Sequence, residues 1–362
     1  MSRVVRSFPD RPAGRRRDST PSIRDVAAAA GVSYQTVSRV LNDSPKVSAG
    51  TRQLVLDVIG RMDYRPNRAA RALGSGRAGA VTVVTADTTL YGYASTLRGI
   101  EEAARSAGLA VGIRVVESDR ADDVRHAVEH VSDPSAGGVI VIAFDPAGSG
   151  VVRALPASVP AVAATEAGGL TGSARTMLFL DERQAAAEAT RHLLDLGHRT
   201  VHHVAIPSET GTSARRAGWR DVLERAGAPV PPVLAGGWDP ESAHAAGVRL
   251  AADPAVTAIL CGNDDTALAV RRALYEAGRN VPGDVSVVGF DDVPGAAYWT
   301  PALTTVRMNF VALGRACLDA VVAEVAGGPL PEVTLEPPTL VLRESTAPPP
   351  TGAGTRRSRP GG

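Results

Sequence analysis

The sequence predicts a small all-α domain at the N-terminus, followed by a larger α/β body. Apolar residues recur at helical spacing on both sides of Gly31, and from Ala80 onward short Val-rich runs alternate with Ala-rich helical patterns. Positive charge collects before residue 80. Residues 1–79 hold fifteen Arg or Lys and six Asp, about +9, so the remainder of the 362-residue chain carries about −8. This segregation indicates a module for a polyanion, attached to a domain with another task.

Residues 22–42, SIRDVAAAAGVSYQTVSRVLN, are predicted to form two short helices joined by a turn at Gly31. Ser22 and Asp25 have the spacing of a capping box, which starts the first helix. Ser33 is placed to cap the second helix. Each helix has one apolar stripe, made by Ile23, Val26, Ala27 and Ala30 in the first and by Val37, Val40 and Leu41 in the second.

The polar side chains of the second helix suit contact with DNA. Arg39 can pair with guanine and Gln35 with adenine, while Tyr34 adds a flat ring and a hydroxyl. We therefore expect a helix-turn-helix in which these three residues read bases in the major groove. A helical hairpin inside a larger core is the alternative from the pattern alone. Short polar or cationic side chains are expected to contact the DNA backbone, namely those of Ser33, Thr36, Ser38, Asn42, Lys46, Ser48 and Thr51.

A third helix is predicted to close the core of this headpiece, which spans residues 21–65. Ser48 caps that helix. Residues 1–20 are rich in Arg, Pro and Ser and lack apolar periodicity, so they are expected to form a disordered basic arm. The apolar residues of the third helix are Leu54, Val55, Val58, Ile59 and Met62.

The segment from Val32 to Val40, VSYQTVSRV, resembles the recognition segment of the lactose-repressor (LacI/GalR) family of transcriptional regulators. The resemblance extends from about residue 22 to about residue 342. It implies a homodimer that binds a pseudo-palindromic operator in double-stranded DNA. It also implies a repressor of carbohydrate-utilisation genes, whose operator affinity changes when a sugar or glycoside binds. In some relatives the ligand is a corepressor, so the sign of the response stays open.

Residues 66–79 are expected to form a hinge helix and a linker. Asn67 can cap a short helix that contains Arg68, Ala70 and Leu73. The family resemblance implies that this helix enters the minor groove of operator DNA, where Leu73 wedges into the central base step. A plain linker helix is the alternative. The stretch GSGRAG at 74–79 matches a dinucleotide-binding fingerprint, but it precedes a strand instead of following one, so it is interpreted as a flexible joint.

The body, residues 80–346, shows repeated β and α patterns that exceed one doubly wound domain. Together with the resemblance, this implies two Rossmann-like lobes with a cleft between them, as in type I periplasmic sugar-binding proteins. The predicted strands are 80–85, 109–116, 138–142, 161–164, 177–180, 200–206, 258–262, 285–290, 303–306 and 339–342, and the predicted helices are 96–107, 121–131, 182–196, 216–226, 241–252, 266–277 and 311–325.

Ligands in such sheets bind beyond the carboxyl ends of strands, so polar residues just after strands are candidates. Asp87, Asp145, Asn263 and Asp291 stand at such positions, together with Asp264 and Asp292. They are suited to sugar hydroxyls, and Trp238 and Phe310 offer rings for the apolar face of a pyranose. Each residue has a structural alternative, because an Asp after a strand often caps the next helix.

The resemblance adds Arg215 to this set and supports two of its members. SARRAGW at 213–219 matches the family element whose arginine reaches the effector, which is Arg215 here. LCGND at 260–264 and VSVVGFDD at 285–292 match the other effector motifs and carry Asn263 and Asp291. PALTTVRMNF at 301–310 matches a further family element. Met308 and the pair at 86–87 depart from the β-galactoside-binding pattern, so the sugar is not specified.

Other function classes are disfavoured. HAVEH at 126–130 has the order of an inverted zinc-protease motif, but its apolar residues at helical spacing favour an ordinary sheet-covering helix with exposed histidines. No nucleophile elbow and no P-loop is present, so we expect neither an enzyme nor a cofactor or metal site. A sugar-binding transport receptor without a DNA role is the main rival, and an NAD-dependent enzyme is less favoured.

The remaining features suit a cytoplasmic protein. The N-terminus has no apolar signal region, and no membrane span is expected. Cys261 and Cys317 lie in apolar contexts, which predicts reduced core thiols. His202 and His203 lie within one strand run, so at least one should be a satisfied core or edge residue. Residues 347–362 are predicted to be a disordered tail without a leucine heptad, which favours a dimer over higher oligomers.

Overall fold

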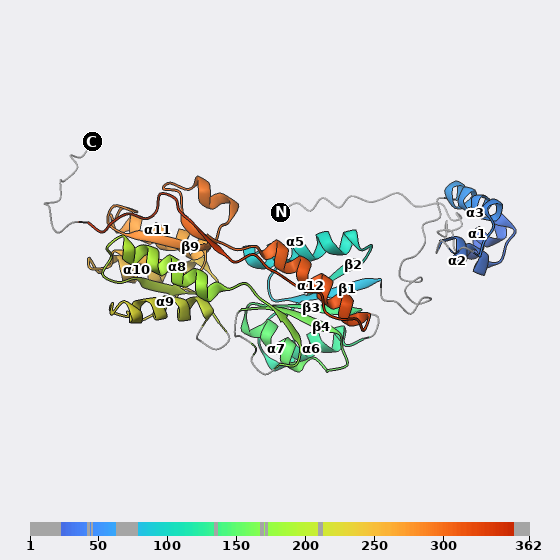
Figure 1. Cartoon of the computed structure of the whole chain (residues 1–362), viewed down its shortest axis with the longest axis horizontal. Coiled ribbons are helices and arrows are strands. Elements are labelled where there is room, and N and C mark those ends of the chain that lie inside the picture. The colour runs from blue at the N-terminus through green and yellow to red at the C-terminus, as the bar shows by residue number, and fades with distance from the viewer. Residues whose placement is uncertain are drawn as a thin grey trace, which may run out of the picture. The chain divides into compact units, whose positions relative to one another are not determined.

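The structure is a computed structural model that describes residues 23–41, 44, 46–62, 79–133, 137–166, 170, 173–208 and 213–350. The chain divides into two compact units, residues 1–76 and 77–362 (Figure 1). Several predictions fall outside the described residues. They concern Ser22, Asn42, the arm at 1–20, the tail from 351 onward, and the hinge residues Asn67, Arg68, Ala70 and Leu73.

The first unit contains three helices, α1 (Ile23–Ala30), α2 (Tyr34–Leu41) and α3 (Ala49–Arg61). Gly31 joins α1 to α2 with φ +65°, a conformation that glycine adopts readily. Ser33 accepts a hydrogen bond from the Thr36 amide at 3.1 Å, and Ser48 caps α3 by accepting one from the Thr51 amide at 3.3 Å. The predicted turn and both caps are therefore confirmed.

The core of this unit is small and built from aliphatic side chains. The helices are too short to be stable alone, so burial of their apolar stripes holds them together. One predicted core residue is wrong: the side chain of Leu54 is 46% exposed, because Val55 and Val58 take the inward face of α3. The buried residues are Val26, Ala27, Ala30, Val37, Val40, Val55 and Val58.

The second unit has two lobes, each with a twisted sheet covered by helices on both faces. The first lobe contains a parallel sheet in the order β2-β1-β3-β4-β5. Its strands are β1 (Ala80–Thr85), β2 (Ala110–Val115), β3 (Gly138–Ala143), β4 (Ala161–Thr165) and β5 (Thr176–Leu178), and its helices are α5 (Tyr91–Ser106), α6 (Ala121–Val131), α7 (Pro146–Ala154) and α12 (Phe310–Val325).

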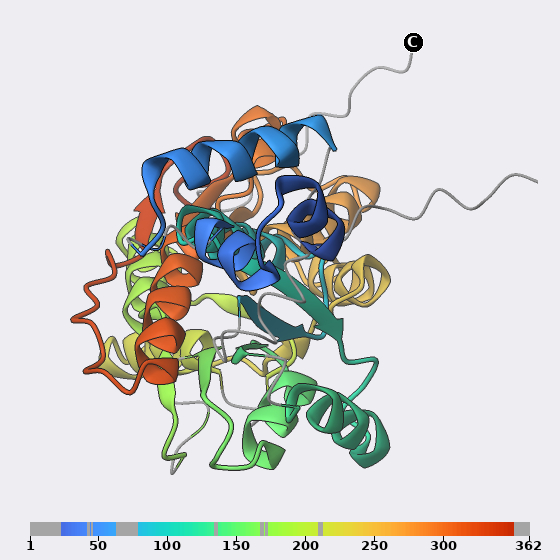
Figure 2. The ribbon, with the colours of Figure 1, turned by 90° about the vertical axis from the view of Figure 1, so that its right-hand side faces the viewer.

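Successive side chains of a strand point to opposite faces of the first-lobe sheet, and one pair of helices covers each face. Ile140 and Ile142 of β3 lie in one cluster with buried residues of α5 and α12. Val139 and Val141 lie in another cluster with buried residues of α6 and α7. Figure 2 shows α12 and the α6–α7 pair on opposite sides of the strands. Every residue of β3 is buried, as expected for a central parallel strand.

The second lobe contains a sheet in the order β11-β10-β9-β8-β6-β7, in which only the edge strand β11 is antiparallel. Helices α8 and α9 pack on one face of it, and α10 and α11 on the other. The strands are β6 (His202–Ala205), β7 (Leu234–Ala235), β8 (Ala258–Cys261), β9 (Ser286–Asp291), β10 (Thr304–Arg307) and β11 (Thr339–Val341), and the helices are α8 (Glu182–Asp195), α9 (Ala214–Arg225), α10 (Pro240–Ala251) and α11 (Asp264–Glu276).

The chain passes between the lobes three times, in the segments before α8, before α12 and before β11. Helix α12 therefore belongs to the first lobe although it follows a strand of the second lobe (Figure 1). Its close contact with α5 requires glycine: a Cβ at Gly314 would lie 2.1 Å from the Thr96 carbonyl oxygen, and one at Gly99 would lie 2.1 Å from that of Val311.

Several predicted boundaries differ from the structure. Helix α5 begins at Tyr91, five residues before its predicted start, and α7 was not predicted because its sequence, PAGSGVVRA, is rich in Gly and Ser. Strand β7 has two residues, and the 3₁₀ helix η2 (Pro294–Tyr298) has five. Ala347, placed at the start of a disordered tail, accepts a hydrogen bond from His198 at 3.0 Å and donates one to Ser286 at 3.0 Å.

Candidate functional site

A cavity lies between the two lobes of the second unit, with walls from both. Its volume is about 30 Å³, which is room for roughly two or three water molecules. The lobes are therefore close together around it. The cavity is lined by Leu90, Tyr91, Gly92, Tyr93, Phe144, Glu166, Glu182, Ile206, Arg215, Trp238, Asn263, Asp291 and Phe310.

Arg215 lies at the centre of the polar part of this cavity. Ser213 caps α9 by accepting a hydrogen bond from the Arg216 amide at 3.2 Å, which places Arg215 in the first turn of the helix. Its Nη2 lies 2.9 Å from Glu182 Oε1, and its Nη1 donates to the Gly262 carbonyl. The guanidinium also lies 4.4 Å from the centroid of the Phe290 ring. These partners hold the cation in one orientation.

Asp291 faces the same guanidinium from the end of β9. Its backbone has φ 106°, and Asp292 follows with φ 55°, so both residues lie in the region that favours glycine. The Asp292 carboxylate accepts hydrogen bonds from Arg307 Nε at 2.7 Å and from Arg343 Nη2 at 2.6 Å, which anchors the turn. Asp291 Oδ1 then lies 3.8 Å from Arg215 Nη2.

Two of the carboxyl groups around Arg215, those of Glu166 and Asp291, have unusual proton affinities. Burial and the neighbouring Glu182 carboxylate raise the pKa of Glu166 to about 8, although Arg215 opposes this shift. Burial also raises the pKa of Asp291 well above its ordinary value. Burial lowers the pKa of Arg215, but the Glu182 and Asp291 carboxylates outweigh it and leave that pKa above its ordinary value. Charge on the carboxylates is therefore costly, whereas the guanidinium stays protonated.

Aromatic rings form the other wall of the cavity. The Tyr93 ring meets the Trp238 ring from the opposite lobe edge to face, with centroids 6.2 Å apart, and meets the Phe144 ring at 5.3 Å. Phe310 lies 5.9 Å from Phe144 and 6.3 Å from Tyr91. The Tyr93 hydroxyl donates a hydrogen bond to Asp145, and burial together with that carboxylate raises the pKa of Tyr93. Aromatic edges and faces of this kind are suited to the apolar side of a sugar ring.

The structure brings together five of the seven predicted effector residues. Arg215, Trp238, Asn263, Asp291 and Phe310 line the cavity, whereas Asp87 and Asp145 do not. Asp87 accepts hydrogen bonds from the amides of Thr89 at 2.5 Å and Leu90 at 2.7 Å, which lower its pKa although burial raises it. Asp145 caps α7 through the Gly148 amide at 2.9 Å. Asn263 lines the cavity and also caps α11 through the Thr266 amide at 2.8 Å.

Sequence reasoning missed the five other acidic or aromatic residues of the cavity. Glu166 directly follows β4, so the strand-end rule covers it once the strand is extended to Thr165. Glu182 begins α8 and Tyr91 begins α5, and no strand directly precedes either residue. Tyr93 and Phe144 carry no sequence signal that separates them from core aromatics. The residues missed are Tyr91, Tyr93, Phe144, Glu166 and Glu182.

The surface of α2 presents the predicted base-reading residues to solvent. The side chain of Tyr34 is 56% exposed, and Gln35 and Arg39 are exposed as well. Val37 and Val40 are buried on the opposite side, so the polar face of the helix is free for a partner. Of the residues expected at the DNA backbone, Ser33, Lys46 and Ser48 are exposed, and Thr36, Ser38 and Thr51 are half-buried.

The other chemical motifs have ordinary structural roles. His126 and His130 are exposed on α6, as predicted, and His130 Nδ1 lies 2.7 Å from the His126 carbonyl. His203 is buried and its Nδ1 lies 2.9 Å from the Leu260 carbonyl oxygen, while burial lowers its pKa to about 4. Cys261 and Cys317 are buried and free, also as predicted. No group of three or more potential metal ligands occurs among the described residues.

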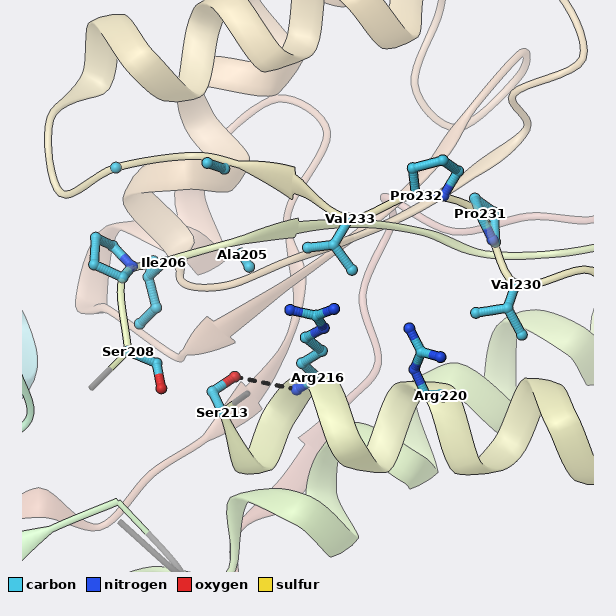
Figure 3. Close-up of a pocket in the computed structure, with 13 residues that line it drawn as sticks. Ala205, Ile206, Ser208, Ser213, Arg216, Arg220, Val230, Pro231, Pro232 and Val233 are labelled. Carbon is cyan, nitrogen blue, oxygen red and sulfur yellow. Dashed lines mark hydrogen bonds between the residues drawn. The ribbon is translucent and has the colours of Figure 1, made fainter. Parts of the chain in front are cut away.

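A second concave region lies on the second lobe, outside the cavity between the lobes. Figure 3 shows Arg216 and Arg220 pointing from α9 toward a wall of Val230, Pro231, Pro232 and Val233. Its volume is about 750 Å³. Within the part of the chain that the structure covers, no helix is both long and apolar enough to cross a membrane.

Comparison with known proteins supports both units. Residues 22–67 match the model for bacterial regulatory proteins of the lacI family, and residues 190–346 match a periplasmic binding protein-like domain. The chain is 30% identical to the lactose operon repressor of Escherichia coli K12 over 345 residues, covering 93% of this chain and 94% of that protein. It is 31% identical to the regulator GalR of the same organism, covering 91% and 96%.

Solved structures agree with this result. The lac repressor dimer bound to operator and the anti-inducer ONPF superposes with a TM-score of 0.81 at 29% identity, covering 91% of this chain and all of that one. The regulator CelR in complex with cellobiose superposes with a TM-score of 0.65 at 28% identity, covering 90% and 99%. The helical headpiece and the two α/β lobes of a type I periplasmic-binding-protein-like fold are therefore confirmed.

Proposed function

The chain belongs to the lacI family of bacterial regulatory proteins, and we propose that a sugar held between its lobes controls operator recognition by its headpiece. The protein is a DNA-binding transcriptional regulator that responds to a sugar, and its relatives include the lactose operon repressor and the transcriptional regulators GalR and CelR. The observation that carries the proposal is the presence of both parts in one chain: a helix with an exposed polar face, and a cavity with polar and aromatic walls.

The proposed base-reading residues are Tyr34, Gln35 and Arg39. Their exposure on α2 and the chemistry of their side chains support this assignment. Ser33, Thr36, Ser38, Asn42, Lys46, Ser48 and Thr51 position the headpiece on phosphates. Two headpieces in a homodimer recognise a pseudo-palindromic operator, and the hinge residues Asn67, Arg68, Ala70 and Leu73 occupy the minor groove between the half-sites. Binding to DNA places the protein in the cytoplasm.

The proposed sugar-binding residues are Arg215, Asn263 and Asp291, together with the rings of Trp238 and Phe310. The guanidinium and the carboxylate hydrogen-bond the hydroxyls of the sugar, and the rings cover its apolar face. The cavity as it stands is smaller than a sugar, so binding requires the lobes to separate and close again. A sugar that prefers one lobe arrangement shifts the population of that arrangement and, through it, the affinity of the headpieces for DNA.

Footprinting on the DNA upstream of the chain's own gene, with and without candidate sugars, tests this proposal. We expect one protected palindrome and a sugar that weakens the protection, since relief of repression is the proposed sign. Strengthened protection would identify a corepressor. Absence of any protected palindrome at low salt would overturn the proposal, because phosphate contacts are strongest there.

A further inference from the structure

We infer that the cavity between the lobes selects a carbohydrate that carries a protonated amine, such as an amino sugar, over the corresponding neutral sugar. This inference rests on the proposed function, because it names the class of sugar that the same site takes. It is carried by the balance of charge in the cavity, by two buried oxygen atoms without partners and by the aromatic residues of the same cavity.

The charges that line the cavity are not balanced. Glu166, Glu182 and Asp291 contribute three carboxyl groups, and Arg215 is the one cationic side chain among the described lining residues. Arg215 forms a close contact with Glu182 at 2.9 Å, whereas Asp291 is 3.8 Å away. Three ionised carboxylates around one guanidinium would repel one another, which agrees with the raised pKa values of Glu166 and Asp291, so a bound ammonium would favour their ionised forms.

Two oxygen atoms in this group have no hydrogen-bond partner in the protein. Glu182 is 5% exposed and Asp291 is 7% exposed, and Glu182 Oε2 and Asp291 Oδ1 each lack a donor. A buried acceptor without a donor is costly, so a ligand that supplies donors at this point gains a large interaction. An ammonium group supplies three donors and a positive charge, whereas a sugar hydroxyl supplies one donor and no charge.

The aromatic residues of the same cavity favour a ring-shaped ligand. Tyr91, Tyr93, Phe144, Trp238 and Phe310 line the same cavity as the carboxyl groups. Their rings offer apolar surface to one face of a sugar. A ring-shaped ligand can therefore stack on these side chains while its amine points to the carboxylates. The site remains suited to carbohydrate, and the excess of acid adds a preference for the charged form.

Thermal shift and calorimetric titration of the full chain with three sets of sugars test this inference at pH 7. The probes are glucosamine, galactosamine and mannosamine, each compared with its parent hexose and its N-acetyl derivative. These derivatives keep the ring but lose the charge. We expect at least one amino sugar to bind about 10-fold or more tightly than both of its neutral relatives, as expected for a charged hydrogen bond in a buried site. A neutral relative that binds equally well or better, or no binding by any amino sugar, would overturn the inference.

Variants connect the preference to the acidic residues. We expect Glu182→Gln and, independently, Glu166→Gln to reduce the ratio of amino-sugar to parent-hexose affinity, because each variant removes one acidic group from the cavity. Glu188→Gln is the matched control, because Glu188 lies on the same helix and bonds Gln184 at 2.8 Å outside the cavity. A ratio unchanged in both cavity variants would contradict the inference. Operator binding measured in parallel separates the two proposals: if a neutral sugar releases operator DNA at the same or a lower concentration than every amino sugar, the proposed function stands and the amine preference fails.

Discussion

Tyr93 of the first lobe and Trp238 of the second meet edge to face with ring centroids 6.2 Å apart. This contact joins the two walls of the cavity directly. Tyr93 is held in place by its hydrogen bond to Asp145, and Trp238 immediately precedes Asp239, which caps α10 through the Ser242 amide at 2.7 Å. Each ring is thus tied to its own lobe, so separation of the lobes must break the contact between them.

Replacement of Trp238 tests the part of this ring in sugar binding. Trp238→Ala removes one of the two rings proposed to cover the apolar face of the sugar, a contact worth about 0.5–1.5 kcal/mol, so we expect the sugar to bind roughly 2- to 10-fold more weakly. Trp238→Phe keeps a ring and should retain most of the affinity. Calorimetric titration with the effector identified by footprinting measures both. Equal affinities for the wild type and Trp238→Ala would show that the Trp238 ring does not contribute to sugar binding.

Arg39→Ala tests the base-reading face. Loss of a bidentate contact to guanine costs about 1–3 kcal/mol of discrimination, so operator preference should fall roughly 5- to 150-fold. Sugar binding, measured by thermal shift, should not change. Arg24→Ala is the control, since it removes one positive charge from an exposed position on α1 in the same unit. An unchanged operator footprint for Arg39→Ala would refute the assignment.

The contact of α5 with α12 predicts intolerance at Gly314. A methyl group there would lie 2.1 Å from the Thr96 carbonyl oxygen and 2.9 Å from the Ile100 nitrogen, both of which are backbone atoms. Gly314→Ala should therefore lower the free energy of unfolding of the second unit by about 1–3 kcal/mol, and urea denaturation measures this. Gly60→Ala, in α3 of the first unit, is the comparison, because nothing lies within 4 Å of the added carbon there. A free energy of unfolding that Gly314→Ala leaves unchanged would contradict the close approach of α5 and α12.

The raised pKa of Glu166 predicts a pH-dependent stability. With a pKa of about 8 in the folded protein and an ordinary value of 4.5 when unfolded, the native state binds more protons between these limits. Stability due to Glu166 should therefore fall as pH rises through that window. Glu166→Gln should gain stability relative to the wild type as pH rises from 6.5 to 8.5, followed by melting temperature. His203 does not affect stability in this range. Its pKa of about 4 in the folded protein changes stability only below pH 6.5, where stability due to His203 rises with pH. A constant difference across the range would disprove the shift.

Particular elements show where sequence reasoning succeeds. The helix-turn-helix was predictable because Gly31 interrupts two apolar stripes, and the caps at Ser33 and Ser48 are local hydrogen bonds. Helix α7 was missed because its Gly and Ser residues suggest a turn, whereas tertiary burial of Val151 and Val152 makes it a helix. Leu54 was assigned to the core because helical spacing alone does not decide which of two adjacent apolar faces turns inward.

The sequence by itself determined the helix-turn-helix, the α/β character of the body and most of the motif residues around Arg215. These features depend on local periodicity, on capping and on strand ends, which the order of residues expresses directly. Only the tertiary structure placed Glu166 and Glu182 beside Arg215 and Tyr93 against Trp238. The physical reason is that the chain crosses between the lobes three times, so the cavity is built from segments far apart in sequence whose meeting is decided by packing. The charge balance of the site, and with it the inferred preference for an amine, follows from that packing.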